Sequence, residues 1–558
     1  MRAIKLALIL PVLGLASYAL AASPTDWPEY GRDPGGMRYS PLTQITPANV
    51  GQLKPAWTYH MNPTPVPGQP PAALSASGGR GRIPTSTGSP VEVDGVLYLP
   101  TPFGRVVALN ADTGKQIWAY ALPAGDQPPF RGVSYWPGDA GHAPRILFGT
   151  IGGRLIALDA KTGEPSRGFG ENGIVNLKTP EIMNGFPDSA GYGLTAPGSI
   201  YRNLIILGSR VQEQPQLGPS GAVRAYNVVT GKLAWTFNGI AQPGDKNHAT
   251  WEDEGWKRRS GVNVWNLMTV DAQRGIAYLP FGAPAIDRNG QDRKGANLYS
   301  SSLVAVNAAT GKYLWHFQLT HHDIWDLDAH TPPTLITVRR NGRNIPAVAA
   351  INKGSYLFIL NRLTGEPLYE VKETPVPAST APGESAWPTQ PIPVKPAQLS
   401  RGGFQMNEVA DVTPQLKAAC EALLRQSNAK ASVMYEPIPF DRPMVQFPSA
   451  EGGPEWGGGA FDPSLGLYII NTNSRGSIEQ IVRRPDGSYG FSTRSFRDPA
   501  SGMSCQQPPW GELSAINVNT GDIAWRIPLG VTDAAPPGRQ NTGRVSNGGP
   551  ILTASGLV

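Results

Sequence analysis

Short apolar stretches alternate with glycine-centred turns along most of this chain of 558 residues. One phrase recurs, in which an apolar strand meets a Thr-Gly pair and a second apolar strand follows, usually ending in an aromatic residue. Glycine readily adopts positive φ, so the pair suits a tight turn and the phrase predicts a β-hairpin. Six copies are present: ALNADTGKQIW (108–118), ALDAKTGE (157–164), AYNVVTGKLAW (225–235), AVNAATGKYLW (305–315), ILNRLTGEPLY (359–369) and AINVNTGDIAW (515–525).

The spacing of these hairpins indicates the architecture. Successive turns up to Gly365 lie 49, 68, 80 and 54 residues apart. A four-stranded blade takes about 40–50 residues, and inserted loops lengthen the interval. The repeat therefore predicts an all-β protein with the β-propeller fold. A β-sandwich with similar turns is the alternative.

Two regions depart from the repeat. Residues 370–450 are rich in proline and poor in repeat signal, so we expect a long insertion there. Within it, residues 414–426 are the best candidate for a short helix. LKPAWTY (53–59) resembles the second half of a repeat and suits a strand that closes the ring. The closing NGGPILTASGLV looks like the first strand of a further blade, so we expect the final blade to be incomplete, unless a ring with fewer blades closes without it.

The N-terminus has the make-up of a secretory signal peptide. Residues 1–21 contain two early cations, an apolar run and a small-residue cleavage site. We expect cleavage, which leaves residues 22–558 as the propeller; a membrane anchor is the alternative. No other stretch is apolar enough to span a bilayer. The net charge of +6 is small and dispersed, which argues against nucleic acid as a partner.

The chain has two cysteines, Cys420 and Cys505. Export places them in an oxidising compartment, where disulfides persist. Both lie in irregular insertions that lack a core of their own. A disulfide between them is therefore favoured over two separate buried thiols.

The densest cluster of chemically active side chains is HHDIWDLDAH (321–330). It directly follows a repeat and so lies on a loop that leaves a strand, where rigid β scaffolds commonly place function. Asp326 and Asp328 are two residues apart, so an extended backbone points both to one side. Paired carboxylates suit a hard cation and a general base. A purely structural loop and a zinc site are the alternatives, the latter formed by His321, His322 and His330.

Six longer motifs run through the chain: DWPEYGRDPGGMRYSPLTQI, GVNVWNLMTVD, HHDIWDLDAHTPPTL, INKGSYLFILNRLTGEP, EWGGGAFDP and CQQPPWGELSAINVNTGDIAW. Together they resemble the pyrroloquinoline quinone (PQQ) dehydrogenases, eight-bladed β-propeller enzymes of the periplasm. The resemblance covers essentially all of residues 25–558 and favours the glucose/quinate-type branch. It implies oxidation of a sugar, polyol or alcohol by hydride transfer to PQQ.

The resemblance also implies roles for single residues. Asp326 matches the base that takes the substrate's hydroxyl proton. Lys353 matches the cation that bonds the quinone oxygens and stabilises charge on reduction. Trp265 matches the aromatic floor under the flat cofactor. Arg131 matches a ligand of a PQQ carboxylate, a task that suits its forked guanidinium.

Further residues are expected to line the cofactor pocket. Trp510 in PPWGE, and Glu455 and Trp456 in EWGGG, match pocket contacts of the family. Thr87 stands where the family usually has a glutamate near the cofactor. These residues complete the expected cofactor-binding set.

The resemblance implies a metal ion, either calcium, another divalent cation or a lanthanide. Its expected ligands are Asp326, Asp328 and an acidic residue after LGSRV, which Glu213 supplies unless the register falls on Gln212. Ala283 stands at a family metal-ligand position, and its side chain cannot bind a cation.

The sequence carries no Cys-x-x-Cys-His motif for haem, so the electron acceptor must be a separate partner. The family implies a membrane quinone or a cytochrome c. Two other interpretations stay open at this point: a non-catalytic propeller scaffold, and an inactive truncated paralogue.

Overall fold

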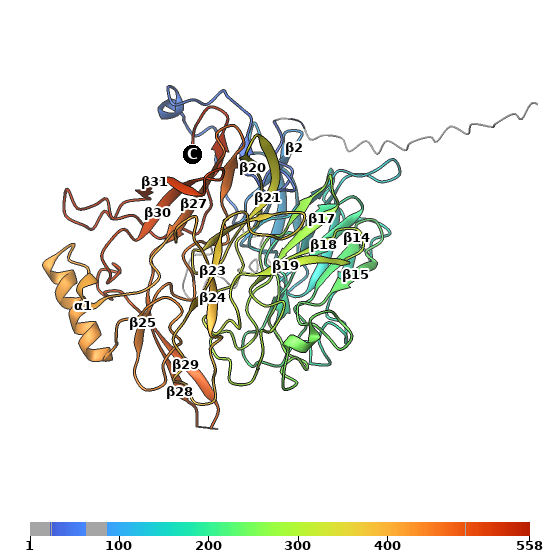
Figure 1. Cartoon of the computed structure of the whole chain (residues 1–558). Helices are drawn as coiled ribbons and strands as arrows, with labels where there is room; N and C mark the ends of the chain where they lie inside the picture. Colours follow the sequence, from blue (N-terminus) through green and yellow to red (C-terminus); the bar gives the residue numbers. More distant parts are fainter. Residues whose placement is uncertain (1–22, 24, 63–85, 486) are drawn as a thin grey trace, which may run out of the picture.

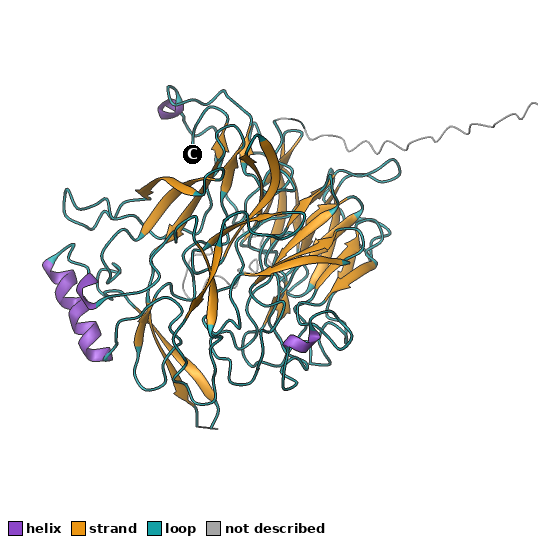
Figure 2. Ribbon diagram, in the orientation of Figure 1, coloured by secondary structure: helices purple, strands orange, loops and turns teal. Residues whose placement is uncertain are grey.

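The computed structural model describes residue 23 and residues 25–62, 86–485 and 487–558. The expected signal peptide, residues 1–21, lies outside the described residues, so its cleavage stays a prediction. The described part of the chain is mainly strands joined by long loops, with one α-helix (Figure 2). The prediction of an all-β protein is confirmed.

Six antiparallel sheets follow one another along the described residues (Figure 1). The first two contain β2 (Val91–Val93), β3 (Val96–Thr101), β4 (Arg105–Asn110) and β5 (Gln116–Ala121), then β6 (Ser134–Trp136), β7 (Arg145–Gly149), β8 (Arg154–Asp159) and β9 (Ile174–Asn176). The third contains β11 (Ser199–Tyr201), β12 (Leu204–Leu207), β14 (Val223–Asn227) and β15 (Leu233–Phe237).

The other three sheets repeat this meander. They contain β16 (Thr269–Asp271), β17 (Ile276–Pro280), β18 (Ser302–Asn307) and β19 (Tyr313–Gln318), then β20 (Thr334–Arg340), β21 (Arg343–Ile351) and β22 (Leu357–Asn361), and finally β26 (Ala460–Asp462), β27 (Leu467–Asn473), β30 (Gly511–Asn517) and β31 (Asp522–Pro528). Each predicted Thr-Gly turn joins or follows strands of such a sheet.

The first strands of successive sheets lie next to one another. Strand β6 contacts β11, β11 contacts β16, β16 contacts β20, and β20 contacts β26. Strand β26 also contacts β1 (Tyr39–Ser40) and β32 (Leu552–Thr553), which pair in parallel. Sheets that share a continuous row of inner strands are the blades of a propeller. Five of the six sheets join this row, and the sheet β2–β5 packs on the sheet β6–β9 through a shared core. The count of eight blades and the incomplete final blade stay predictions.

The aromatic residue that ends a repeat packs on the turn of the next repeat. The indole Nε1 of Trp118 donates to the carbonyl oxygen of Ala160 at 3.0 Å, and its ring lies against Gly163. A Cβ on Gly163 would come within 2.5 Å of that ring, so only glycine fits. The same contact joins Trp235 to Gly311 and Trp315 to Gly365. The repeated glycine and aromatic residue are therefore two halves of one packing contact between neighbouring sheets.

The segment LKPAWTY makes the same contact without forming a strand. Trp57 Nε1 donates to the Ala111 oxygen at 2.9 Å, and the indole lies against Gly114. Residues 53–59 have no strand partner among the described residues, so the predicted closing strand is not formed there. The segment nevertheless covers the sheet β2–β5 as the tail of a repeat would.

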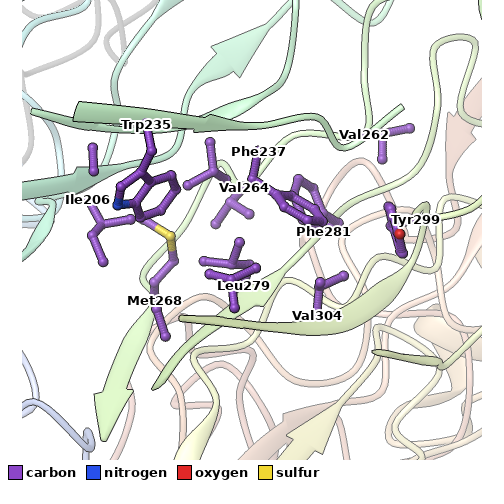
Figure 3. Packing of buried hydrophobic residues seen from close by; sticks show 14 of the residues in the cluster. Ile206, Trp235, Phe237, Val262, Val264, Met268, Leu279, Phe281, Tyr299 and Val304 are labelled. Atoms are coloured by element: carbon purple, nitrogen blue, oxygen red, sulfur yellow. The ribbon is translucent and has the colours of Figure 1, made fainter. Parts of the chain in front are cut away.

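Buried side chains fill the space between adjacent sheets. One cluster combines Ile206, Trp235 and Phe237 of the sheet β11–β15 with Leu279 and Val304 of the sheet β16–β19 (Figure 3). Fully burying side chains of this size contributes roughly 1.5–3 kcal/mol each. Packing between blades, repeated around the ring, fixes the loops that carry the candidate site.

The expected insertion carries secondary structure of its own. It contains the paired strands β23 (Val371–Pro375) and β24 (Thr389–Pro393), the helix α1 (Pro414–Ser427), and β25 (Met444–Gln446), which pairs with β28 (Ser477–Arg483). Strand β28 pairs in turn with β29 (Tyr489–Ser495). One further strand pair, β10 (Tyr192–Gly193) with β13 (Arg210–Val211), lies outside the six sheets.

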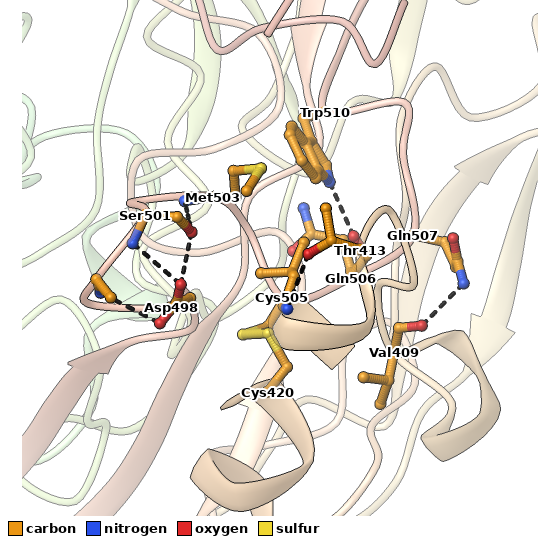
Figure 4. Close-up of a disulfide and its surroundings, with 12 residues drawn as sticks. Val409, Thr413, Cys420, Asp498, Ser501, Met503, Cys505, Gln506, Gln507 and Trp510 are labelled. Atoms are coloured by element: carbon orange, nitrogen blue, oxygen red, sulfur yellow. Dashed lines mark hydrogen bonds between the residues drawn. A yellow bond between two sulfur atoms is a disulfide. The ribbon is translucent and has the colours of Figure 1, made fainter. Parts of the chain in front are cut away.

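The predicted helix is confirmed at Pro414–Ser427. It begins after Thr413, whose hydroxyl accepts a hydrogen bond from the Leu416 amide at 3.0 Å, and Pro414 suits the first turn. The predicted disulfide is also confirmed: Cys420 of the helix is bonded to Cys505 (Figure 4). The insertion is thus linked covalently to the connection that leads into β30.

No helix in the described ranges combines the length and hydrophobicity that a bilayer crossing requires. The three 3-10 turns there are single turns, at Val50–Gln52, His248–Thr250 and Met406–Glu408.

Candidate active site

Loops from distant parts of the chain meet at one region of the propeller. Arg131, Trp265, Asp326 and Trp456 each lie on a connection that leads into the first strand of a sheet, namely β6, β16, β20 and β26. Lys353 lies between β21 and β22. Because the first strands of the sheets are neighbours, the loops that lead into them lie close together.

The centre of this region is a lysine between two aspartates. The ammonium Nζ of Lys353 lies 2.6 Å from Asp326 Oδ1 and 2.9 Å from Asp328 Oδ2. The backbone amide of Lys353 also donates to the Asp328 carbonyl oxygen at 3.0 Å. All three side chains are buried. Buried charges of this kind require such pairing.

The two aspartates have different surroundings. Asp328 accepts further hydrogen bonds from Trp265 Nε1 at 3.0 Å and from the Ala283 amide at 2.5 Å. Burial opposes the charged form of Asp328, but Lys353, His330 and the Ala283 amide outweigh it, so the pKa of Asp328 is below its usual value. Burial raises the pKa of Asp326 well above its usual range, and only Lys353 and Arg288 oppose that rise. Asp326 is therefore the better proton acceptor of the pair.

The backbone at Asp326 is also unusual, with φ of +62°. A non-glycine residue rarely adopts this left-handed conformation, and such residues cluster at functional sites. The conformation is held by hydrogen bonds from the Leu327 and Trp325 amides to the carboxylate of Asp323. It turns the Asp326 side chain towards Lys353.

A layer of flat groups adjoins the charged centre. The Arg131 guanidinium carbon lies 5.0 Å from the Trp265 ring centroid and 5.1 Å from that of Trp456. The His330 ring stacks on Trp265, with centroids 5.0 Å apart and an interplanar angle of 20°. The Trp265 carbonyl oxygen accepts hydrogen bonds from Arg131 Nη1 and from Thr195 Oγ1. The indole of Trp265 is thus fixed, while its side chain stays partly exposed.

The charges of Lys353 and Arg131 both act on Glu455. Burial raises its pKa to about 7, although Lys353 and Arg131 act in the opposite direction. The connection that carries it is tied to Lys353, whose carbonyl oxygen accepts a hydrogen bond from the Gly453 amide at 2.9 Å. Five loop segments therefore contribute to one group of charged and flat side chains.

The family model described as glucose/ethanol/alcohol dehydrogenase, beta-propeller domain, of the PQQ type, matches residues 27–558. The chain belongs to the PQQ-dependent dehydrogenase family. This confirms the predicted family and its enzyme class, the oxidoreductases that act on CH–OH groups.

Several curated relatives match nearly the whole chain. The glycerol dehydrogenase large subunit of Gluconobacter oxydans is 31% identical, over 96% of this chain and 77% of the relative. The quinoprotein glucose dehydrogenase of Escherichia coli is 31% identical, over 97% and 72%. The quinate/shikimate dehydrogenase (quinone) of Acinetobacter baylyi is 30% identical, over 96% and 71%.

Solved structures share the fold of this PQQ-family chain. The quinohemoprotein alcohol dehydrogenase from Comamonas testosteroni gives a TM-score of 0.66 at 23% identity, covering 96% of this chain and 69% of that one. A europium-containing methanol dehydrogenase gives 0.66 at 20% identity, covering 96% and 81%. At this level of identity the likeness supports the propeller fold alone.

The side chains present suit the flat, anionic PQQ molecule. Trp265 offers a partly exposed ring, and Arg131 and Lys353 supply cations beside it. The Nε atom of Arg131 is buried and has no hydrogen-bond partner among the described residues, so an additional acceptor can be accommodated there. A guanidinium and an ammonium next to an aromatic floor are the groups that a planar carboxylate-bearing quinone requires.

The side chains present fit the expected metal ion less well than they fit PQQ. No three His, Cys, Asp or Glu side chains of the described ranges converge closely enough to hold one. Lys353 already bridges Asp326 and Asp328, and Ala283 offers only its backbone amide. Glu213 is exposed, although its charge acts on the neighbouring Asp287. Asp326 and Asp328 share Lys353, but in the described ranges the three expected metal ligands do not form a metal centre.

Trp510 lies apart from the other predicted residues. Its ring is buried in the core formed with Cys420, Cys505 and Phe447, and its Nε1 donates to the Gln506 oxygen at 2.8 Å (Figure 4). The disulfide holds the CQQPPW segment against the helix α1, and this draws the indole into that core. The described contacts of the Trp510 side chain all belong to this core, so its predicted role in cofactor binding gains no support.

Thr87 lies beside the site instead of within it. Its hydroxyl donates to the Phe130 oxygen at 2.9 Å, one residue before Arg131. The adjacent Ser89 amide donates to the Arg131 oxygen at 3.3 Å. Thr87 therefore helps to hold the backbone that carries Arg131, and its own side chain is exposed.

The sequence analysis missed two residues on the connection after β17. The Asp287 carbonyl oxygen accepts the Asp326 amide at 3.2 Å, and Asp287 Oδ1 is buried without a hydrogen-bond partner among the described residues. Burial and the charge of Glu213 raise the pKa of Asp287 to about 7. The neighbouring Arg288 faces the same carboxylates. An Asp-Arg pair seven residues after the end of the buried strand β17 was the only sequence signal that could have identified them.

Proposed function

We propose that this chain is a periplasmic PQQ-dependent dehydrogenase that oxidises a hydroxyl group of a sugar, polyol or alcohol. The observation that carries the proposal is the Asp326–Lys353–Asp328 group beside the Trp265 ring, assembled from three loops. Relatives named for glycerol, glucose and quinate support this substrate class. Electrons would then pass to a membrane quinone or to a cytochrome c.

When bound, PQQ supplies a quinone that accepts hydride from the alcohol carbon. Trp265 and Trp456 would stack on the flat ring system of PQQ, and Arg131 would bind one of its carboxylates. Lys353 is placed to donate a hydrogen bond to an oxygen atom that gains negative charge during the reaction. Its ammonium is buried and held by two carboxylates, so it stays charged.

Asp326 would take the proton of the substrate hydroxyl. Its raised pKa makes it a stronger base than an exposed aspartate, and Lys353 compensates the charge that it carries before it accepts the proton. Asp328, with its lowered pKa and several donors, stays ionised and orients both Lys353 and Trp265.

The proposal includes a metal ion but does not specify which one. Asp326, Asp328 and Glu213 carry oxygen donors of the kind that calcium, another divalent cation or a lanthanide prefers, although in the described ranges they do not converge on one position. Asp287, whose Oδ1 lacks a partner, adds a fourth carboxylate to the same region.

The proposal predicts the behaviour of Asp326→Asn. The enzyme reconstituted with PQQ and either calcium or a lanthanide should oxidise members of a sugar and alcohol panel in a dye-linked assay. The substitution removes the proton acceptor, so kcat should fall by about 10²–10⁴-fold. PQQ binding, followed by absorbance, should persist because Arg131, Trp265 and Lys353 are unchanged.

The control for this experiment is Asp522→Asn, which changes an exposed aspartate paired with Lys395 at the surface. It should turn over substrate like the unmodified enzyme. Undiminished turnover by Asp326→Asn would contradict the assigned role of Asp326, and no turnover of any alcohol by the unmodified enzyme would contradict the proposed function.

A further inference from the structure

A hairpin outside the six sheets reaches the connection that carries Asp287. Strands β28 and β29 form this hairpin (Figure 1), and Glu479 lies directly opposite Thr493. Phe491 is two residues from Thr493 along β29, so alternation places it on the same face. This face of the hairpin contacts Arg288, which precedes Glu479 by 191 residues.

Three residues of that face, Glu479, Thr493 and Phe491, contact the Arg288 guanidinium. Its Nη1 atom lies 3.2 Å from Glu479 Oε2 and 2.9 Å from Thr493 Oγ1, to which it donates hydrogen bonds. Its guanidinium carbon lies 4.3 Å from the centroid of the Phe491 ring. Thr493 Oγ1 in turn donates to Glu479 Oε2 at 2.7 Å. An arginine bonded and stacked in this way has little conformational freedom left to lose when it binds a ligand.

The Arg288 guanidinium has N–H groups that the described hydrogen bonds do not use. Arginine has five N–H groups, and both described hydrogen bonds come from Nη1. The Nε atom is buried and lacks a hydrogen-bond partner among the described residues. The Arg288 side chain as a whole is 13% exposed, whereas Glu479 is 1% exposed. Glu479 is therefore a buried anchor, and Arg288 reaches a partly open position with unused donors.

The position of Arg288 links it to the reacting group. The preceding residue, Asp287, accepts the Asp326 amide through its carbonyl oxygen at 3.2 Å. Burial lowers the pKa of Arg288, but the negative charges of Asp326, Glu479 and Asp287 outweigh burial and raise it. Arg288 thus directly follows a residue that is hydrogen-bonded to the proposed base, and the charge of that base acts on it.

We propose that Arg288 is a specificity-determining residue that donates hydrogen bonds to a hydroxyl group next to the reacting CH–OH group. The inference rests on the proposed function and names its substrate class, the polyhydric alcohols and sugars. A substrate that lacks this second hydroxyl leaves the donors without a partner, and a site built for hydrogen bonds discriminates strongly against such an analogue.

Charge favours a neutral polyol over a hydroxy acid. The carboxylates of Asp326, Glu479, Asp287 and Glu213 all act on Arg288. Arg288 is already paired with the buried carboxylate of Glu479, so a carboxylate on the substrate would lie near an anion that is already in place. Neutral hydroxyl groups accept the same hydrogen bonds without that cost.

The test compares glycerol with 1-propanol, which have the same carbon skeleton and differ only in hydroxyl number. Arg288→Gln should lower kcat/KM for glycerol at least tenfold more than for 1-propanol in the PQQ-loaded enzyme. Thr493→Val, which removes one anchor, should shift the ratio in the same direction by less. Equal losses for the two substrates would overturn the assignment.

Arg494→Gln is the matched control. Arg494 lies next to Thr493 on β29 but on the other face of the hairpin, paired with Ile478, and its own side chain is exposed. It should leave kcat/KM for both substrates unchanged. Turnover of either substrate by the unmodified enzyme tests the proposed function, and the ratio between them tests Arg288, so the two can fail separately.

A binding measurement completes the test without turnover. Glycerol is titrated calorimetrically into PQQ-loaded Asp326→Asn, with and without Arg288→Gln. The double variant should bind glycerol at least tenfold more weakly. Equal affinity would overturn the role of Arg288 even if no dehydrogenase activity were measurable.

Discussion

Asp326 and Asp328 show how surroundings decide the role of chemically identical side chains. Both carboxylates contact the same ammonium of Lys353, yet the pKa of one is raised and that of the other is lowered. The difference follows from their surroundings. Lys353, His330 and the Ala283 amide lower the pKa of Asp328, whereas the charges of Asp287 and Asp328 add to the effect of burial on Asp326. Two residues apart on one loop, they divide into a base and an orienting group.

A second pair of carboxylates has a measurable consequence. Glu29 and Asp33 line a cavity of about 40 Å³ together with Thr269 and Arg38. Burial and the nearby Asp33 raise the pKa of Glu29 from 4.5 to about 8. Folding therefore favours the protonated form of Glu29. Between pH 4.5 and 8 the folded state binds the proton and the unfolded state does not, so stability falls as pH rises through this window.

Glu29→Gln should remove this dependence. The variant should have a higher free energy of unfolding than the unmodified protein at pH 8, by an amount on the order of a few kcal/mol. The difference should shrink towards pH 5, because the glutamate is then protonated in the folded state and increasingly so in the unfolded one. Denaturant unfolding across this range measures it, and a pH-independent difference would contradict the raised pKa.

The residues of the site divide into those that the sequence could predict and those that it could not. Asp326, Lys353, Trp265 and Arg131 stand in recognisable motifs, and the structure brings them together. Arg288 has no motif, because its role depends on a hairpin 191 residues further along the chain. Contacts between segments so far apart depend on the packing of the whole ring, which residue spacing does not reveal.

At the scale of elements, the repeated phrase predicted most of the fold. Its Thr-Gly turn and terminal aromatic residue were visible, and the predicted hairpins are present as strand pairs such as β18 and β19. The contact between one repeat's tryptophan and the next repeat's glycine was not visible, because it joins separate sheets. LKPAWTY illustrates the limit: the sequence predicted a strand, and the structure shows the tryptophan contact without one.

The tryptophan–glycine contact can be tested with two glycines. Gly311 has φ of +70°, and a Cβ there would lie 2.6 Å from the Trp235 ring. Gly95 has φ of +75°, and nothing lies within 4 Å of its Cβ position. Alanine at either site costs about 1–2 kcal/mol for its backbone conformation.

Gly311→Ala should destabilise the protein by roughly 1–3 kcal/mol more than Gly95→Ala, because the added methyl group displaces the indole. Thermal and urea unfolding of the two variants measure the difference. Equal losses would show that the ring accommodates the methyl group and that the packing contact is unimportant.

The position of Trp510 also depends on contacts between elements. The PPWGE motif predicted a cofactor contact, but Cys505 lies five residues earlier and is bonded to the helix α1. The helix and the disulfide were each predicted from the sequence. Their combined effect, a separate core that takes in the indole, depends on Phe404, Phe447 and Phe496, which no motif connects.

For the molecule as a whole, the disulfide joins the insertion to the last complete sheet. It closes a loop of 85 residues between Cys420 and Cys505. Restricting the unfolded chain over such a loop stabilises a protein by about 2–5 kcal/mol. The crosslink therefore contributes to the ring by fixing a segment that lies outside its repeats.

Replacing both cysteines by serine should lower the free energy of unfolding by about 2–5 kcal/mol. Adding a thiol reductant to the unmodified protein should approach the same value, whereas the Cys420→Ser/Cys505→Ser variant should not respond to reductant. Unfolding curves with and without reductant make the comparison, and a reductant effect on the double variant would point to a cause other than this bond.

The β28–β29 hairpin lies outside the repeated blades, so its length and sequence can vary without disturbing the packing of one blade on the next. Evolution can therefore alter which molecules are admitted while the oxidation chemistry stays intact. Exchanging hairpins between relatives offers a practical route to catalysts with new substrate ranges on an unchanged ring.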